Sequence, residues 1–136
     1  MNYFLKLNGI SIIYAITILI PIQLVLNVYR LTRITEWNIQ TVNKIIGLTS
    51  LLAFLVFSLL LFFLTRKWLS GGKARYLTVV LWLPYYVLFA FLFATLFPIT
   101  HNGDIPNPAS GLLIIGAFIV YPLYIMAMNF FAGFNE

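Results

Sequence analysis

The sequence predicts an all-α membrane protein whose four transmembrane helices form two hairpins, with both termini in the cytoplasm. Charged residues make up only 8% of the chain and hydrophobic residues 62%, with a mean hydropathy of +1.01. A soluble domain carries about 25% charged residues, so this chain lacks the charge to cover a globule in water. Four uncharged apolar runs, and a cluster of cations between them, give the number of helices and their orientation.

Each apolar run is close to the length of about 20 residues that a helix needs to cross the hydrocarbon core of a bilayer. The runs contain no Asp, Glu, Lys, Arg or His. A chain of 136 residues is expected to form one unit, so residues 1–136 are interpreted as a single transmembrane domain. The expected spans are 7–29, 45–64, 76–99 and 111–134.

The segment 65–75 is the one cluster of charge in the chain, and it sets the orientation. It carries four cations and no acid: Arg66, Lys67, Lys73 and Arg75. Short loops rich in Lys and Arg stay in the cytoplasm, where these side chains also meet anionic lipid headgroups. We therefore expect this loop inside, with segments 30–44 and 100–110 outside.

The first outer segment, 30–44, alternates polar and apolar residues. This pattern favours a short interfacial helix, or an extension of the second span above the membrane. A lid that gathers a ligand is the alternative. Thr35 is expected to cap a helix that begins at Glu36, and Trp37 suits the headgroup layer.

The second outer segment, 100–110, contains a helix-start signal. Asn107 followed by Pro108 is typical of an N-cap and the first helical position. Together with Ala109 these residues also match the box of aquaporin-type water channels. Those channels are longer and carry two such boxes on paired half-helices, so a single box before a full span favours the helix cap.

His101 and Asp104 are the only histidine and the only acid of that segment. One imidazole and one carboxylate are too few ligands for a closed metal site, so we expect a solvated turn and no metal. An enzyme acting on lipid is disfavoured for the same reason, because this pair would be its only conceivable catalytic centre.

Other catalytic and cofactor-binding patterns are missing from the sequence. The chain has no cysteine, and its three acidic residues lie outside the apolar runs. It has no Gly-rich phosphate loop, and no charge within a span marks an ion or proton pathway. The cations flank apolar runs and form no face for phosphates. We therefore expect no enzymatic activity, no cofactor and no nucleic-acid partner.

Polar residues near the outer ends of the first two spans predict a shallow cleft open to the outside. Gln23, Asn27 and Arg30 follow one another at i, i+4 and i+7, which places them on one helix face. Asn43 lies at the outer end of the second span. Ordinary hydrogen bonding between helices, at about 0.6 kcal/mol per contact, is the favoured interpretation of these residues, and the cleft is the alternative.

Prolines and tyrosines near the middle of the third and fourth spans predict a second cluster. Each proline frees the carbonyl four residues earlier, and a buried tyrosine hydroxyl needs a partner. One interpretation is a binding site built on interrupted helices. The favoured one is a clasp in which tyrosine hydroxyls bind the freed carbonyls and hold two kinked helices together. The cluster comprises Pro84, Tyr85, Tyr86, Tyr121, Pro122 and Tyr124.

Small loops, no soluble domain and no catalytic group favour an interaction protein. We expect non-enzymatic binding of another membrane protein or a peptide, as an accessory subunit or an immunity or resistance factor. The alternative is a small channel, holin or transporter of a neutral solute that works as an oligomer. The expected location is a bacterial-type cell membrane, and the expected partners are the lipid bilayer and another membrane protein or a second copy.

Overall fold

The computed structural model describes residues 2–70 and 72–134, and in this part of the chain it contains helices and no strand. The prediction of an all-α fold is confirmed. The α-helices are α1 Tyr3–Leu26, α2 Val28–Thr35, α3 Ile39–Trp68, α4 Thr78–Leu96 and α5 Pro108–Ala132, and two 3₁₀ helices are η1 Lys73–Leu77 and η2 Asn102–Asp104.

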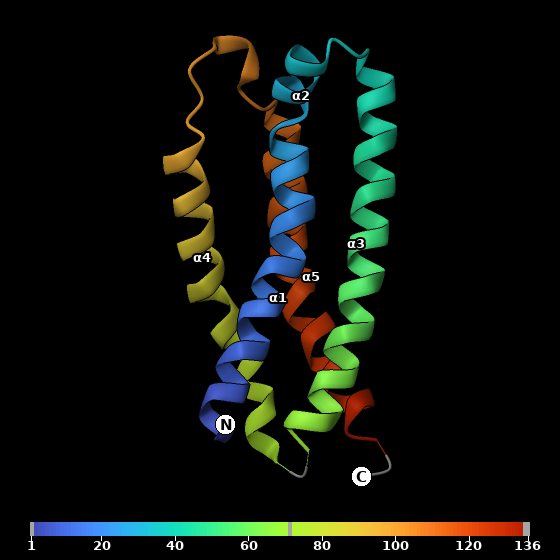
Figure 1. Cartoon of the computed structure of the whole chain (residues 1–136), viewed down its shortest axis with the longest axis vertical. Helices are drawn as coiled ribbons and strands as arrows, with labels where there is room; N and C mark the ends of the chain where they lie inside the picture. The colour runs from blue at the N-terminus through green and yellow to red at the C-terminus, as the bar shows by residue number, and fades with distance from the viewer. Residues whose placement is uncertain (1, 71, 135–136) are drawn as a thin grey trace.

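Four helical segments are long and apolar enough to cross a membrane: α1, α3, the joined segment η1–α4, and α5. Figure 1 shows them as an elongated bundle. One end, here called the basic end, holds the start of α1, the end of α3, η1 and the end of α5. The opposite, distal end holds α2 and η2. The two predicted hairpins are therefore α1–α3 and α4–α5.

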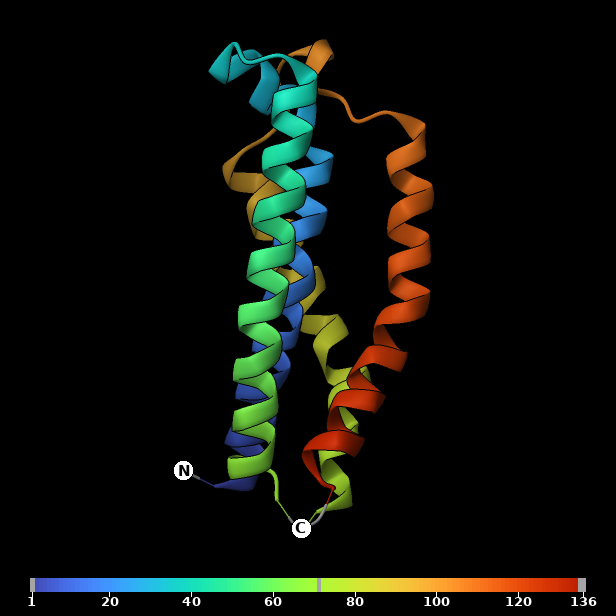
Figure 2. The same cartoon turned by 90° about the vertical axis from the view of Figure 1, so that its right-hand side faces the viewer.

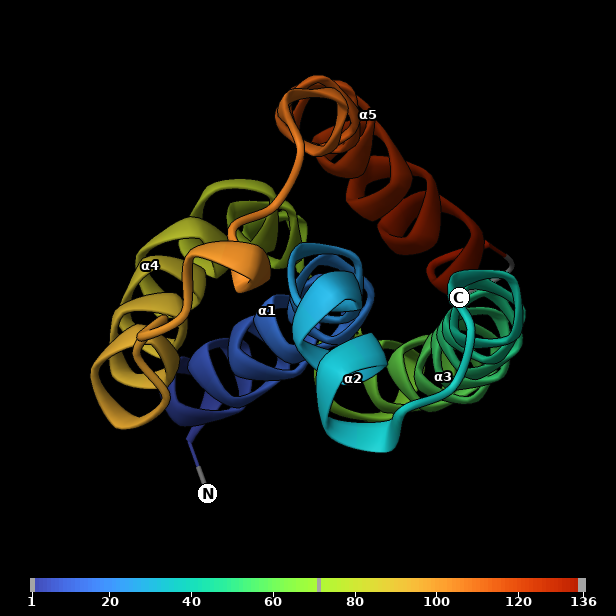
Figure 3. The same ribbon diagram turned by 90° about the horizontal axis from the view of Figure 1, so that it is seen from above.

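Helix α1 lies at the centre of the bundle. It contacts α3, α4 and α5, and the view along the bundle shows it between the other three (Figure 3). It is also the most buried of the four long helices. The other three therefore expose most of their apolar surface to the surroundings.

Asparagine side chains cap the first turn of three of the four long helices, α1, α3 and α5. The side chain of Asn2 accepts from the Leu5 amide, that of Asn38 from the Thr41 amide, and that of Asn107 from the Ser110 amide. Such N-caps satisfy amides that have no partner within the helix. The predicted start of the last helix at Asn107 and Pro108 is thus confirmed.

The predicted helix start at Thr35 and Glu36 is wrong. Glu36 ends α2 in a left-handed conformation with φ 60°, and the Thr35 hydroxyl donates to the Leu31 carbonyl. Helix α3 instead begins at Ile39, because Asn38 is the stronger N-cap. The segment thus forms a short helix, α2, and an early start of α3.

The basic half of the bundle has a packed aromatic core. The Trp82 ring contacts the rings of Tyr86, Phe118 and Tyr121, with ring centroids 6.0, 5.7 and 4.9 Å away. Trp82 is only 2% exposed. Edge-to-face aromatic pairs add about 0.5–1.5 kcal/mol to the burial itself, so these contacts join α4 firmly to α5.

A buried polar chain ties α5 to the segment before α4. Asn129, fully buried on α5, donates to the Thr78 hydroxyl at 2.9 Å, and that hydroxyl donates to the Arg75 carbonyl. The Arg75 guanidinium lies over Gly133, where an added Cβ would come within 1.8 Å of Nη2. Arg75 is therefore half-buried at the carboxyl end of α5, where the helix dipole favours a cation, whereas Arg66, Lys67 and Lys73 are exposed.

Candidate functional site at the distal end

The distal end is held together by two arginines and one carboxylate. The Arg33 Nε and Nη2 atoms donate to Asp104 Oδ1 and Oδ2, both at 2.9 Å. The Arg30 Nε atom lies 3.7 Å from Asp104 Oδ2. Asp104 is only 2% exposed, so the prediction of a solvated turn is wrong for this residue, because η2 folds back onto α2. His101 is exposed, as predicted.

The contacts of Asp104 determine its protonation. The bidentate hydrogen bond from Arg33 holds the pKa of Asp104 below its ordinary value, against the opposing effect of desolvation. The charges of Arg33, His101 and Arg30 lower this pKa further. The carboxylate is therefore ionised at neutral pH and serves as an anchor for arginine, not as a proton donor.

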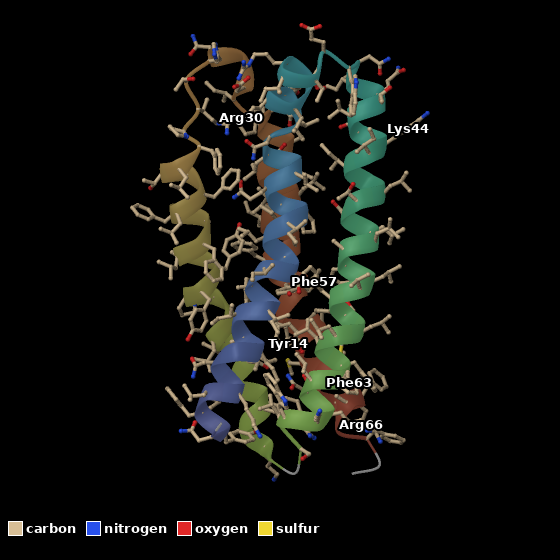
Figure 4. All side chains as sticks on the ribbon, in the orientation of Figure 1. Tyr14, Arg30, Lys44, Phe57, Phe63 and Arg66 are labelled. Carbon is tan, nitrogen blue, oxygen red and sulfur yellow. The ribbon has the colours of Figure 1, made fainter. Side chains whose placement is uncertain are left out.

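Arg30 connects three parts of the distal end. Its Nη1 atom donates to the Phe97 carbonyl at 2.9 Å, and Phe97 is the residue that ends α4. Arg30 is on α2 and also faces Asp104 of η2. It lies at the upper end of the bundle in Figure 4, whereas Lys44 extends away from it. One side chain thus positions the end of α4 relative to α2.

Two grooves between α1 and α4 contain most of the predicted outer cleft. They have volumes of about 330 and 420 Å³ and share five lining residues. The shared residues are Gln23, Asn27, Arg30, Phe93 and Phe97. The helical spacing of the three polar residues therefore brings them to one place, but their facing helix is α4 and not α3 as predicted.

Asn43 belongs to a different groove. It lies with Asn107 and Ser110 in a hollow of about 370 Å³ bounded by α1, α3 and the start of α5. Sequence reasoning joined Asn43 to the other three because α1 and α3 are neighbours. The structure separates them because Gln23, Asn27 and Arg30 face α4, whereas Asn43 faces the start of α5.

The predicted Pro/Tyr cluster is divided between several contacts. The Tyr121 hydroxyl donates to the Tyr14 carbonyl, the Tyr124 hydroxyl pairs with the Ser58 hydroxyl, and the Tyr85 hydroxyl donates to Asn8 Oδ1 at 2.6 Å. These partners lie on α1 and α3. They are not the carbonyls of Val80 and Phe118 that the prolines were expected to free.

The remaining members of the cluster take part in packing or lie at its edge. Tyr86 packs edge to face on Phe118, with centroids 5.1 Å apart. Pro84 is exposed, and Pro122 is half-buried beside a groove of about 290 Å³. Aromatic rings thus fill the space between α4 and α5 at this level, where a site in the middle of the bundle would have to lie.

Two structural features could not be predicted from the sequence. The Arg33–Asp104 pair joins residues 71 positions apart, and no local sequence pattern predicts such a contact. Tyr14 is fully buried at the centre of the tyrosine group. Its helix is apolar, so no polar partner in the sequence indicates that the face with Tyr14 is the buried one. Within residues 2–70 and 72–134, no three His, Asp or Glu residues gather as a metal site.

The comparisons with known proteins give no relative. No protein-family model, no curated protein and no solved structure matches the chain.

Proposed function

We propose that the chain is a multi-pass protein of the cell membrane, of bacterial type, that acts without catalysis by binding another membrane protein or a membrane-inserted peptide. The basic end would face the cytoplasm with both termini, since segment 65–75 carries four cations in a short loop. The distal end would face outward. The partner would bind in the distal half, along α5.

The observation that carries this proposal is the separation of α5 from α1 and α3 toward the distal end (Figure 2). Two adjoining grooves of about 370 and 230 Å³ follow this opening and share Val25 and Leu113. Their walls are mostly apolar, and Asn43, Asn107 and Ser110 lie at the distal mouth. An apolar helix with a polar end matches this distribution.

Small residues along the opening allow a helix to approach closely. Ala109 and Ala117 of α5 and Gly47 of α3 line these grooves, and a Cβ added at Gly47 would meet no atom within 4 Å. Since lipid tails are as apolar as a helix surface, helices associate in a bilayer through close packing and hydrogen bonds. The open position at Gly47 allows the close approach, and the exposed side-chain amide of Asn43 in the same groove supplies a hydrogen-bonding group.

Site-specific photo-crosslinking in the native membrane tests this proposal. A photoreactive residue replaces Leu113, which lines both grooves, or the neighbouring Leu112, which lines neither. The two leucines are similarly exposed, 66% and 73%, so lipid contact is matched. We expect one discrete protein adduct from position 113 and none from position 112.

Equal adducts at both positions, or none at either, would contradict the proposal. An adduct between two copies of the chain would favour the alternative function, an oligomeric channel, holin or transporter of a neutral solute. That alternative is supported by the polar column of Gln23, Asn27 and Arg30 beside α4. In this alternative, a solute would have to pass the aromatic packing around Trp82. Flux of solutes measured in liposomes would test it.

A further inference from the structure

A groove of about 290 Å³ lies between α4 and α5 in the basic half of the bundle, at the outer edge of the aromatic core. Val80, Trp82 and Leu83 of α4 line it, and so do Phe118 and Pro122 of α5. Val80 and Leu83 are exposed, so the groove opens to the surroundings of the bundle. It shares no lining residue with the four grooves described above.

Both helices of this groove contain a proline that leaves a backbone carbonyl without its helical donor. Proline has no N–H, so it cannot bind the carbonyl four residues earlier. Pro122 frees the carbonyl of Phe118, and Pro84 frees that of Val80. Both carbonyls belong to residues that line the groove. In the part of the chain that the structure describes, no side chain donates to either carbonyl.

The freed carbonyl of Phe118 borders the groove. In an α-helix the carbonyl of a residue points toward the residue four positions later, which lies on the same face. The Phe118 carbonyl therefore lies between Phe118 and Pro122, and both of these residues line the groove. The groove exposes some polar surface, although Trp82 is the only lining residue with a polar side-chain atom. The polar groups that it exposes are therefore backbone groups or the Trp82 indole.

Trp82 supplies a hydrogen-bond donor. Within residues 2–70 and 72–134, no acceptor pairs with its indole N–H. Its ring packs on that of Phe118, with centroids 5.7 Å apart, so one molecule in the groove can reach the indole and the Phe118 carbonyl together. A polar group without a hydrogen bond is costly in an apolar medium, and the core of a bilayer holds no water to bind it.

A hydroxyl group matches this pair, because it has one donor and two acceptor lone pairs. It can donate to the Phe118 carbonyl and accept from the Trp82 indole at the same time, whereas an acyl chain leaves both unpaired. The volume lies near the lower end of the range of about 300–1,000 Å³ that is usual for small-molecule sites, which fits one ring with a short chain. We propose that this groove binds an apolar molecule that carries a hydroxyl group, a lipid-soluble phenol or alcohol.

Magnetic resonance of the full chain in detergent tests the inference. The chain has three tryptophans, so isotope labelling of the indole nitrogens gives three N–H signals, and the one that Trp82→Phe removes belongs to Trp82. The probes are para-butylphenol and butylbenzene, which differ only in the hydroxyl, with concentrations expressed per detergent. We expect a saturable shift of the Trp82 signal, with an affinity about tenfold higher for the phenol than for butylbenzene.

A change of one proline tests the role of the freed carbonyl. Pro122→Ala supplies the missing N–H, which then binds the Phe118 carbonyl within α5, so most of the preference for the phenol should be lost. Pro21→Ala makes the same change in α1, outside the groove, and should leave the preference unchanged. The position of the Trp82 signal without a probe reports whether each variant keeps the fold around the ring. Equal losses of preference in the two variants would overturn the inference.

A third probe, para-butylcyclohexanol, distinguishes the two sources of the hydroxyl. A higher affinity for para-butylphenol would assign the site to phenols, because an aromatic ring gains edge contacts with Trp82 and Phe118. A higher affinity for the cyclohexanol would assign it to alcohols, and either result supports a hydroxyl site. Equal affinities of the unchanged chain for all three probes would show partition of apolar molecules only and would overturn the inference. The proposed partner site lies in the distal half, so each proposal can fail alone.

Discussion

The two halves of this bundle are stabilised by different interactions. In the basic half, buried rings of α4 and α5 pack on one another and their hydroxyls bind α1 and α3. In the distal half, α4 and α5 diverge from α1, and the connection depends on Arg30, Arg33 and Asp104. A close-packed half can therefore support a half whose helices diverge and leave grooves between them. The divergent helix ends are then held in place by the polar contacts of Arg30, Arg33 and Asp104.

The largest expected effect is removal of the aromatic centre. Trp82→Ala takes away a side chain that is 2% exposed and contacts three rings. Large-to-small changes of buried aromatic residues cost about 3–5 kcal/mol because a cavity forms. We expect a loss of this size in the free energy of unfolding, measured in detergent. Leu83→Ala, at an exposed neighbouring position, is the control and should cost much less.

The second effect should be confined to the distal half. Asp104→Asn removes the charge that pairs with Arg33 and Arg30, and leaves two arginines without an acid. Hydrogen exchange of amides in residues 28–36 and 97–107 should become at least about tenfold faster, because local opening no longer breaks the ion pairs. Exchange around Tyr121 should not change. A uniform change along the chain would show that the two halves are not separate.

Acid should act at the same place. Arg33 lowers the pKa of Asp104 in the folded chain, so the contribution of this carboxylate to stability is complete above the pKa of the unfolded chain. The contribution is lost as the pH falls through the lower, folded pKa. We expect distal amides to exchange faster, relative to the intrinsic rate, only at strongly acidic pH. The Asp104→Asn variant should lack this additional acid response.

A smaller effect is expected from one hydroxyl in the basic half. Tyr121→Phe keeps the ring against Trp82 and removes the hydrogen bond to the Tyr14 carbonyl. Hydrogen bonds between helices in membranes contribute about 0.6 kcal/mol on average. The free energy of unfolding should fall by about that amount, and hydrogen exchange of the distal amides should not change. Faster exchange of the distal amides would contradict the independence of the two halves.

The smallest effect is expected at the end of α5. Gly133→Ala places a methyl group where the Arg75 guanidinium lies, so the flexible side chain must move off the helix end. A cation there contributes about 0.3–1 kcal/mol, and the loss should not exceed this range. Gly116→Ala, where a Cβ meets open space, is the matched control and should not destabilise the chain. Equal melting temperatures of the two variants would show that the contact of Arg75 does not contribute.

Predictions that depend on residues close together in the sequence were confirmed more often than predictions that depend on contacts between distant helices. The cap at Asn107 was predictable because a cap involves residues three positions apart. The start of α3 was placed wrongly because Thr35 and Asn38 are both capping residues, and the backbone at Glu36 decided between them. Helical spacing correctly placed Gln23, Asn27 and Arg30 on one face. It could not show that the helix opposite this face is α4 and not α3.

By itself, the sequence determined the helical class, the four apolar segments and the cluster of charge between them, because hydropathy and charge act locally along the chain. Only the tertiary structure decided that Asp104 is buried between two arginines, that Asn43 lies apart from Gln23, and that the tyrosine hydroxyls bind α1 and α3. The physical reason is that all four long segments are apolar on every side. Their pairing is then set by ring packing and a few polar contacts between residues far apart in the sequence.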